Sequence, residues 1–180
     1  MMKSSLSDNN KDRNQIVDQA RQAALRKLSA GERTEKEVLD FLCGKGCTAE
    51  EAAQITHEFS EWGYIDDKKY CRRYFEYGRS KGKATARIIR ELAQKGISSD
   101  KAREVLSDMK NNDHESSLTD DRDTALTVGM KMAANQADMG KLIDDKFLAR
   151  VGRRLAGLGY DSSTCYYVIG RVRAAADKDD

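Results

Sequence analysis

The feature that most constrains this fold is a threefold repeat. Offsets of 50 and then 63 residues bring EVLDFLCGKGCTAEEAAQIT (37–56), RIIRELAQKGISSDKAREVL (87–106) and RVGRRLAGLGYDSSTCYYVI (150–169) into register. The first two copies coincide at Leu39/Ile89, Leu42/Leu92, Lys45/Lys95, Gly46/Gly96, Thr48/Ser98, Ala52/Ala102 and Ile55/Val105. A repeat of this length is one supersecondary unit that buries its apolar face against its neighbours. The register therefore predicts three similar domains in tandem.

Each copy reads as helical. Apolar residues recur at helical spacing, strand-like alternation is absent from the sequence, and the chain contains no proline. In every copy a glycine precedes a Thr, Ser or Asp by two residues, so the glycine can close one helix and the polar side chain can cap the next. A further helix leads each copy, with a stripe such as Tyr70, Tyr74 and Tyr77 in the second. We predict an all-α fold of three tandem three-helix, helix-turn-helix-like repeats in an elongated array.

The expected domain boundaries follow from this register. The three repeats span residues 13–62, 66–110 and 118–175, and residues 1–12 and 176–180 are expected to be disordered tails. Residues 111–117 form either a hinge or a fixed turn. The predicted helix caps are Thr34, Thr48, Asp66, Ser98 and Asp161. We expect an extended monomer.

Asp66 and Asp67 are adjacent carboxylates and could be taken for a chemical site. Gly63 turns the chain just before them and the tyrosine stripe follows, so Asp66 is placed to cap a helix. Asp67 then lies in the first turn, where the helix dipole favours an anion. No neighbouring residue completes a catalytic or metal site. We interpret the pair as structural.

Metal, cofactor and catalytic chemistry find little support in the sequence. Four cysteines lack the density and spacing of a disulfide scaffold or a zinc ribbon, and Cys43, Cys47 and His57 lack a fourth ligand. His57 and His114 are the only histidines. We expect no metal, no cofactor and no catalytic residue. No apolar run approaches the ~18 residues of a membrane span, and the expected location is the cytoplasm.

Positive charge is concentrated in the middle of the chain. Residues 61–106 carry 12 Lys and Arg against 7 Asp and Glu, whereas both flanking segments are slightly acidic. Helical spacing places cations opposite the apolar stripes of the second copy, and the third copy repeats part of this row where the first has Arg33, Glu37 and Asp40. The predicted binding residues are Lys69, Arg72, Arg73, Arg79, Lys83, Arg87, Arg90, Lys146, Arg150 and Arg153. They would meet phosphates or an acidic protein groove; a merely solvated face is the alternative.

Three stretches carry a resemblance to a family of known function: residues 33–42, GYIDDKKYCRRYFEYGRSKGKATARIIRELAQKGIS (63–98) and LARVGRRLAGLGYD (148–161). The most specific part is an aspartate pair, then an aromatic residue, an arginine-rich segment and the L-x-x-K-G-I turn. On these residues the chain resembles the RecX family of recombination regulators over roughly residues 20–173. Cys71 stands where the family favours alanine, a departure that concerns packing.

The resemblance implies a negative regulator that is not an enzyme. Such a protein binds the RecA–DNA filament in its groove and inhibits the recombinase, ATPase and coprotease activities of RecA. Some members are similar in also contacting single- or double-stranded DNA. The implied partners are therefore the RecA filament and DNA, with no membrane partner.

A helix-turn-helix protein that acts on DNA directly is the alternative function. Cationic helices suit phosphates, although the candidate faces lack a cluster of Asn, Gln and Arg for reading base edges. Strong preference for one sequence in a binding assay with naked DNA would favour this alternative.

Overall fold

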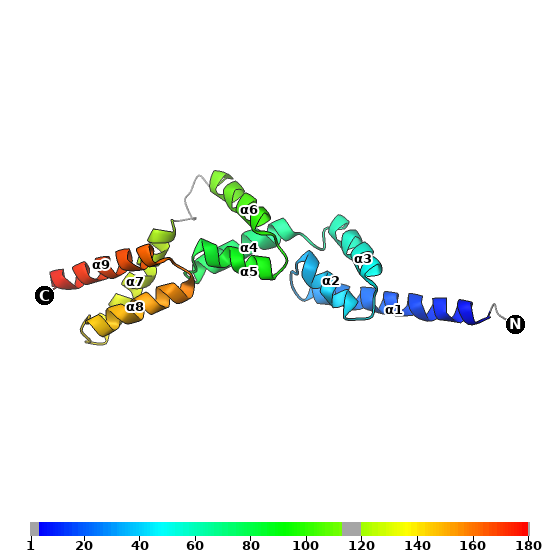
Figure 1. Cartoon of the computed structure of the whole chain (residues 1–180), viewed down its shortest axis with the longest axis horizontal. Helices are drawn as coiled ribbons and strands as arrows, with labels where there is room; N and C mark the ends of the chain where they lie inside the picture. Colours follow the sequence, from blue (N-terminus) through cyan, green and yellow to red (C-terminus); the bar gives the residue numbers. More distant parts are fainter. Residues whose placement is uncertain (1–3, 113–119, 180) are drawn as a thin grey trace. The chain divides into compact units, whose positions relative to one another are not determined.

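The computed structural model describes residues 4–112 and 120–179, and every regular element in these ranges is an α-helix. The nine described helices are α1 (Ser4–Ser29), α2 (Glu35–Cys43), α3 (Ala49–Glu61), α4 (Asp67–Ser80), α5 (Thr85–Gln94), α6 (Ser99–Asn112), α7 (Asp121–Asp138), α8 (Asp145–Leu158) and α9 (Ser162–Asp179) (Figure 1). The prediction of an all-α fold built from three-helix repeats is confirmed. None of the described helices combines the length and apolar character needed to cross a membrane.

The chain divides into two compact units. The N-terminal unit comprises Met1–Cys71 and Ala93–Ser98, and the C-terminal unit comprises Arg72–Leu92 and Ser99–Asp180. Both boundaries cut the second repeat, so its first two helices contribute residues to both units. The expected domain boundaries therefore stay a proposal, as do the elongated array and the monomeric state.

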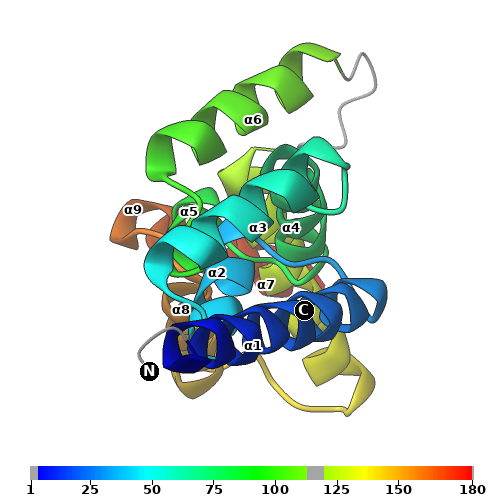
Figure 2. The same ribbon diagram turned by 90° about the vertical axis from the view of Figure 1, so that its right-hand side faces the viewer.

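In the N-terminal unit, α2 and α3 lie against α1 (Figures 1 and 2). Ion pairs from Arg13 to Glu51 and from Arg21 to Glu58 join α1 to α3. The core is formed by Ala20, Ala24, Val38, Leu42, Cys47, Ala52, Ile55, Phe59 and Ile65. Apart from Cys47 and Ile65, which lie in the turns, these residues are apolar positions of the helical pattern, so each helix of the first repeat buries one face.

In the C-terminal unit, α7, α8 and α9 pack on one another. Their core includes Phe147, Leu148, Val151, Leu155, Leu158, Val168 and Val172. Gly129 of α7 faces Val168 of α9 so closely that an added Cβ would clash with the valine side chain. The absence of a side chain at Gly129 thus sets the approach of α7 to α9.

Successive repeats are joined at the same position of the repeat in both units, by a side-chain donor in one and a backbone donor in the other. Thr34, just before α2, donates its hydroxyl hydrogen to the carbonyl oxygen of Lys95 at 2.6 Å. Ala84, just before α5, donates its N–H to the carbonyl oxygen of Leu158 at 3.0 Å. Offsets of 50 and 63 residues relate these two contacts, so the turn of each later copy docks onto the start of the middle helix of the copy before it. Gly96 and Gly159 follow these two carbonyls with φ of 90° and 95°, a conformation that favours glycine.

Helix extends into both segments that the sequence marks as tails. α1 begins at Ser4 rather than near residue 13, and α9 continues to Asp179. No glycine or proline interrupts α1, or α9 after Gly170, so nothing local stops either helix. Residues 1–3 and 180 lie outside the described residues. So does most of the 111–117 segment, because the described part of the chain stops at Asn112 and resumes at Asp120.

Candidate protein- and nucleic-acid-binding surface

The two adjacent aspartates both accept backbone hydrogen bonds. Asp66 Oδ1 accepts the N–H of Lys69 at 2.9 Å, as an N-cap of α4 does. Asp67 Oδ1 accepts the N–H of Glu35 at 3.0 Å, at the start of α2 in the same unit. Among the described residues no group of three or more His, Cys, Asp and Glu is placed to hold a metal ion. The contacts of both carboxylates are thus structural.

Other predicted caps also lie at helix starts. Thr34 and Thr48 each form a capping box, with Glu37 and Glu51 respectively. Asp161 accepts the N–H of Thr164 at 2.7 Å, and this hydrogen bond lowers the pKa of the Asp161 carboxyl. Ser98 directly precedes α6.

Asp144, which was not among the predicted caps, accepts the N–H of Phe147 at 2.8 Å at the start of α8. Its signal was present in the sequence as the string LIDDKF, which resembles the YIDDKK that opens α4.

Two of the predicted binding cations, Lys83 and Arg87, are engaged by one carboxylate. Glu91 accepts from Lys83 Nζ at 2.5 Å, from Arg87 Nε at 2.9 Å and from the hydroxyl of Tyr74 at 2.9 Å. Partial burial alone would raise the pKa of Glu91, but these hydrogen bonds outweigh burial and lower the pKa to about 2. Arg87 also donates to the carbonyl oxygen of Gly157 in the third repeat. Lys83 and Arg87 therefore stabilise the C-terminal unit and offer less free charge than their sequence positions suggest.

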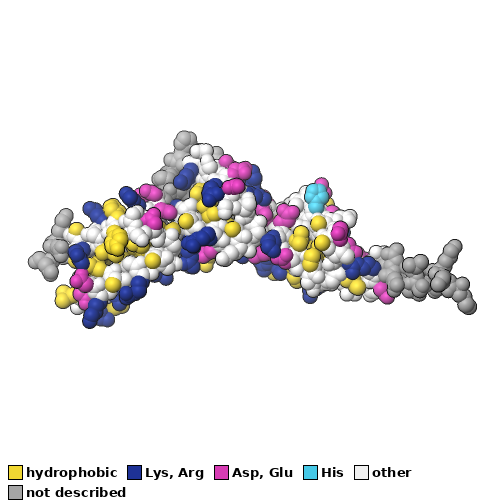
Figure 3. Space-filling model, in the orientation of Figure 1, with side chains coloured by type: hydrophobic (Ala, Val, Ile, Leu, Met, Phe, Trp, Pro, Cys, Tyr) yellow, Lys and Arg dark blue, Asp and Glu magenta, His cyan; other side chains and the backbone are white. Residues whose placement is uncertain are grey.

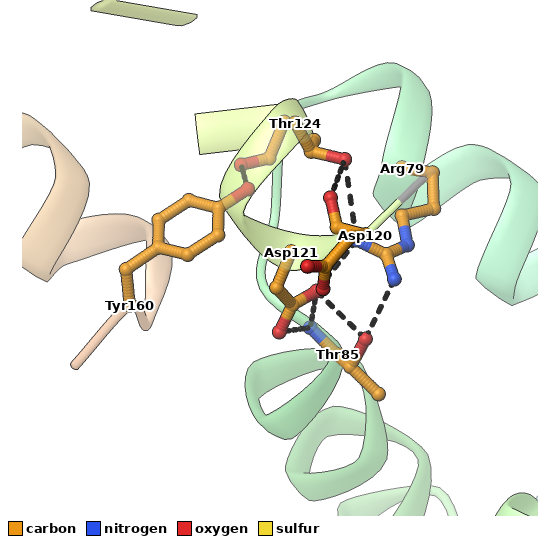
Figure 4. Close-up of polar contacts among 7 residues, drawn as sticks. Arg79, Thr85, Asp120, Asp121, Thr124 and Tyr160 are labelled. Carbon is orange, nitrogen blue, oxygen red and sulfur yellow. Dashed lines mark hydrogen bonds and ion pairs between the residues drawn. The ribbon is translucent and has the colours of Figure 1, made fainter. Parts of the chain in front are cut away.

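Arg79 lies inside the C-terminal unit, and its side chain is only 10% exposed. Figure 4 shows its guanidinium among residues of α5 and α7: it pairs with Asp121 at 2.6 Å and donates to Thr85 Oγ1 at 2.7 Å and to Thr124 Oγ1 at 3.3 Å. Asp121 in turn accepts the N–H of Thr85 at 3.2 Å, at the start of α5. Arg79 thus joins the end of α4 to α5 and α7, in contrast to the exposed position that its helical face predicts.

Tyr160 fixes the turn next to this cluster. Its hydroxyl donates to the carbonyl oxygen of Gly82 at 2.9 Å, linking the third repeat to the turn between α4 and α5. Burial raises the pKa of Tyr160 to about 12, so the hydroxyl keeps its hydrogen at any physiological pH. The hydroxyl can therefore donate this hydrogen bond throughout that pH range.

The remaining predicted cations are exposed. In the N-terminal unit, Lys69 lies 3.6 Å from Glu32. In the C-terminal unit the exposed cations are Arg72, Arg73, Arg90, Lys146, Arg150 and Arg153. Lys146, Arg150 and Arg153 occupy one face of α8 because they are four and three residues apart. Arg150 also donates to Gln136 Oε1 at 2.8 Å and stacks over Phe147.

On the face drawn in Figure 3, Lys and Arg side chains are interspersed with Asp and Glu. Lys146, Arg150 and Arg153 therefore form one exposed row on α8, called the α8 row below. The predicted row on α4 and α5 instead divides into exposed cations and cations that form ion pairs within the chain.

The acidic positions of the first copy are engaged as well. Glu37 pairs with Lys95 at 2.9 Å, and Asp40 pairs with Lys36 at 2.6 Å. Burial would raise the pKa of Glu37, but hydrogen bonds from Lys95 and the Thr34 backbone lower it overall. Glu37 therefore pairs with a lysine of the second repeat, and Asp40 pairs with a lysine of its own helix.

The fold defines a class: proteins built from tandem three-helix domains. Family models described as the first and second three-helix domains of RecX match residues 20–58 and 66–106. The chain belongs to the RecX family, whose members are regulatory proteins rather than enzymes.

Relatives extend this similarity along the chain. The regulatory protein RecX of Streptomyces lividans is 27% identical over 165 residues, covering 91% of this chain and 82% of the relative. That of Clostridium botulinum (strain Eklund 17B / Type B) is 32% identical over 110 residues, covering 61% of this chain and 50% of the relative. The chain thus aligns with only half the length of the clostridial protein.

Solved structures share the fold. The crystal structure of RecX from Lactobacillus salivarius matches with a TM-score of 0.66 and 21% identity, covering 89% of this chain and 99% of that one. A second crystal structure of a regulatory protein RecX gives a TM-score of 0.65 at 18% identity, covering 93% of this chain and 78% of that one.

Proposed function

We propose that this chain is a negative regulator of the RecA recombinase. It binds the RecA–DNA filament, in the filament's groove, and inhibits the recombinase, ATPase and coprotease activities. Membership of the RecX family supports RecA as the partner. The proposed domains are the three repeats at residues 13–62, 66–110 and 118–175.

The observation that carries the surface assignment is a set of cations without carboxylate partners. Arg72, Arg90, Lys146, Arg150 and Arg153 are exposed, and none forms an ion pair with a carboxylate of the described residues. Charges that are not neutralised within the chain can neutralise phosphates and release their counterions. We assign filament contact first to these five residues and second to Lys69 and Arg73. Arg79, Lys83 and Arg87 are assigned a structural role.

The α8 row gives the sharpest test. Lys146→Glu, Arg150→Glu and Arg153→Glu are combined in one variant, and binding is measured by co-sedimentation with preformed RecA filaments at two salt concentrations. We expect weaker binding and a flatter salt dependence, because fewer ionic contacts release fewer counterions. Inhibition of RecA ATP hydrolysis should fall in parallel.

Two controls make this result interpretable. Glu37→Lys combined with Asp40→Lys alters charge in the first repeat and should reduce binding far less, provided that circular dichroism shows it folded, because Glu37 also caps α2 and pairs with Lys95. Circular dichroism should be unchanged in the α8 variant, because all three of its side chains are exposed. Filament binding equal to the parent would exclude the α8 row as the contact surface.

Direct action on DNA is the second candidate function, and the exposed cations of α8 favour it equally. Naked single-stranded and double-stranded DNA, tested without RecA in the same sedimentation assay, distinguish the two. Tight binding to one DNA sequence would support a helix-turn-helix regulator of DNA, whereas binding that requires RecA would support the filament.

A further inference from the structure

A groove in the C-terminal unit lies apart from the predicted cation row of α8. It has a volume of about 770 Å³ and is formed by the end of α4 and the following turn, Met109 of α6, α7 from Thr124 to Asn135, and Arg154 of α8. None of its uncompensated cations was among the predicted binding residues. The groove is therefore formed by tertiary packing and could not be predicted from the repeat alignment.

The floor of the groove is apolar and well supported. Met109, Val128 and Met132 contribute flexible thioethers and a branched side chain to its lining. Gly82 packs onto Val128, since an added Cβ at this glycine would lie 2.6 Å from the valine side chain. The bond from Tyr160 to the carbonyl oxygen of Gly82 holds the same turn. The groove is consequently preformed, which lowers the entropic cost of filling it.

The rim of the groove is cationic. Lys81, Lys131 and Arg154 are exposed, and in the part of the chain that the structure describes no carboxylate forms an ion pair with them. Arg79 also lines the groove, but Asp121 neutralises it. Glu76 is the single carboxylate among the described lining residues, so three free cations face one acid.

We propose that this groove binds an acidic segment of a partner protein that also carries aliphatic side chains. Carboxylates of the segment would pair with Lys81, Lys131 and Arg154, and its aliphatic side chains would bury on the thioether floor. A nucleic-acid strand fits less well, because no aromatic side chain lines the described groove to stack a base. The inference goes beyond the proposed function: it concerns a different surface and a partner defined by chemistry.

The test uses the full-length protein and a fluorescein-labelled peptide of alternating Glu and Leu, with binding followed by fluorescence anisotropy. Lys131→Glu combined with Arg154→Glu should weaken peptide binding by about tenfold or more, because two attractive charges become repulsive. Lys141→Glu combined with Arg171→Glu is the matched control: it changes the net charge equally at exposed positions outside the groove lining. It should change the affinity by less than about twofold.

Two further probes separate the apolar contribution from the ionic one. A peptide with Ser in place of Leu should bind more weakly to the parent. Met132→Gln keeps the length of the side chain but makes the floor polar, so it should weaken binding of the Leu peptide and leave the Ser peptide unaffected. An equal loss for both peptides would contradict the proposed floor.

The competing occupant is single-stranded DNA, tested as a labelled oligothymidine. If the oligonucleotide binds and is weakened by the groove variant while the Glu–Leu peptide does not bind, the proposal is overturned in favour of a nucleic-acid groove. Equal peptide affinity of the parent and the groove variant overturns it as well. Because RecA is absent from this assay, its outcome is independent of the filament experiment.

Discussion

The hydroxyl of Thr34 donates a 2.6 Å hydrogen bond to the carbonyl oxygen of Lys95, although 61 residues separate them in the chain. The same hydroxyl accepts the N–H of Glu37 at 3.2 Å, so one fully buried side chain both caps α2 and joins the first repeat to the turn of the second. Thr48, by contrast, caps α3 from an exposed position. The two threonines share a motif and differ in their tertiary contacts.

Thr34→Ala should destabilise the chain by about 1–3 kcal/mol, because it removes a cap and leaves the part-buried carbonyl oxygen of Lys95 without its donor. Thr48→Ala removes only a cap and should cost about 1 kcal/mol. Thr34→Ser keeps both hydrogen bonds and should lie near the parent. Urea unfolding followed by circular dichroism measures all three. Equal costs for the two alanine variants would show that the bond to Lys95 contributes nothing.

The Glu91 cluster predicts a dependence of stability on pH. Because the pKa of Glu91 is lowered from 4.5 to about 2, its ionised form stabilises the folded chain above pH 4.5, and this contribution is lost as the pH falls toward 2. Glu91→Gln should therefore destabilise the chain at neutral pH by about 1–3 kcal/mol. The difference between parent and variant should shrink across the same acidic window.

The measurement is the free energy of unfolding at a series of pH values for the parent, Glu91→Gln and Glu50→Gln. Glu50 is exposed in the first turn of α3 and serves as the control. A gap between parent and Glu91→Gln that stays constant from neutral pH to pH 2 would rule out the proposed ionic cluster.

Two helical glycines should respond oppositely to alanine. Gly129→Ala places a Cβ against Val168 and should cost about 1–3 kcal/mol through overpacking. Gly170→Ala in α9 meets no atom within 4 Å and should stabilise the helix by about 0.5–1 kcal/mol. Thermal unfolding measures whether each variant is more or less stable than the parent. Stabilisation by Gly129→Ala would mean that α7 and α9 pack less closely than the structure has them.

The repeat register predicted the helices and their glycine turns well, because both depend on local periodicity and on the backbone freedom of glycine. It placed Arg79 wrongly on an exposed face. A helical pattern shows that Arg79 lies away from the tyrosines of α4, but not that Asp121, 42 residues later, comes to cover it. The groove was missed for the same reason, since Lys131 and Arg154 line one groove only after α7 and α8 pack. Tertiary neighbours, rather than helix periodicity, decide which cations are free.

Substitution of Arg79 should affect the stability of the chain, whereas substitution of Arg72 should affect filament binding. Arg79→Gln leaves Asp121 without its ion-pair partner in a partly buried site and should destabilise the chain by about 2–4 kcal/mol. Where the variant remains folded, the salt dependence of its filament binding should match the parent. Arg72→Gln, at an exposed position, should change stability by less than about 0.5 kcal/mol.

Under the proposed function, Arg72→Gln should also weaken filament binding and lower the slope of log affinity against log salt by about one, because one phosphate contact is lost. Co-sedimentation with RecA filaments at several salt concentrations, paired with thermal unfolding of the same samples, measures both quantities. The opposite assignment, a lower salt slope for Arg79→Gln and a lower stability for Arg72→Gln, would mean that the buried ion pair is broken when the filament binds. In that case the exposed cations without carboxylate partners would not be the residues that contact the filament.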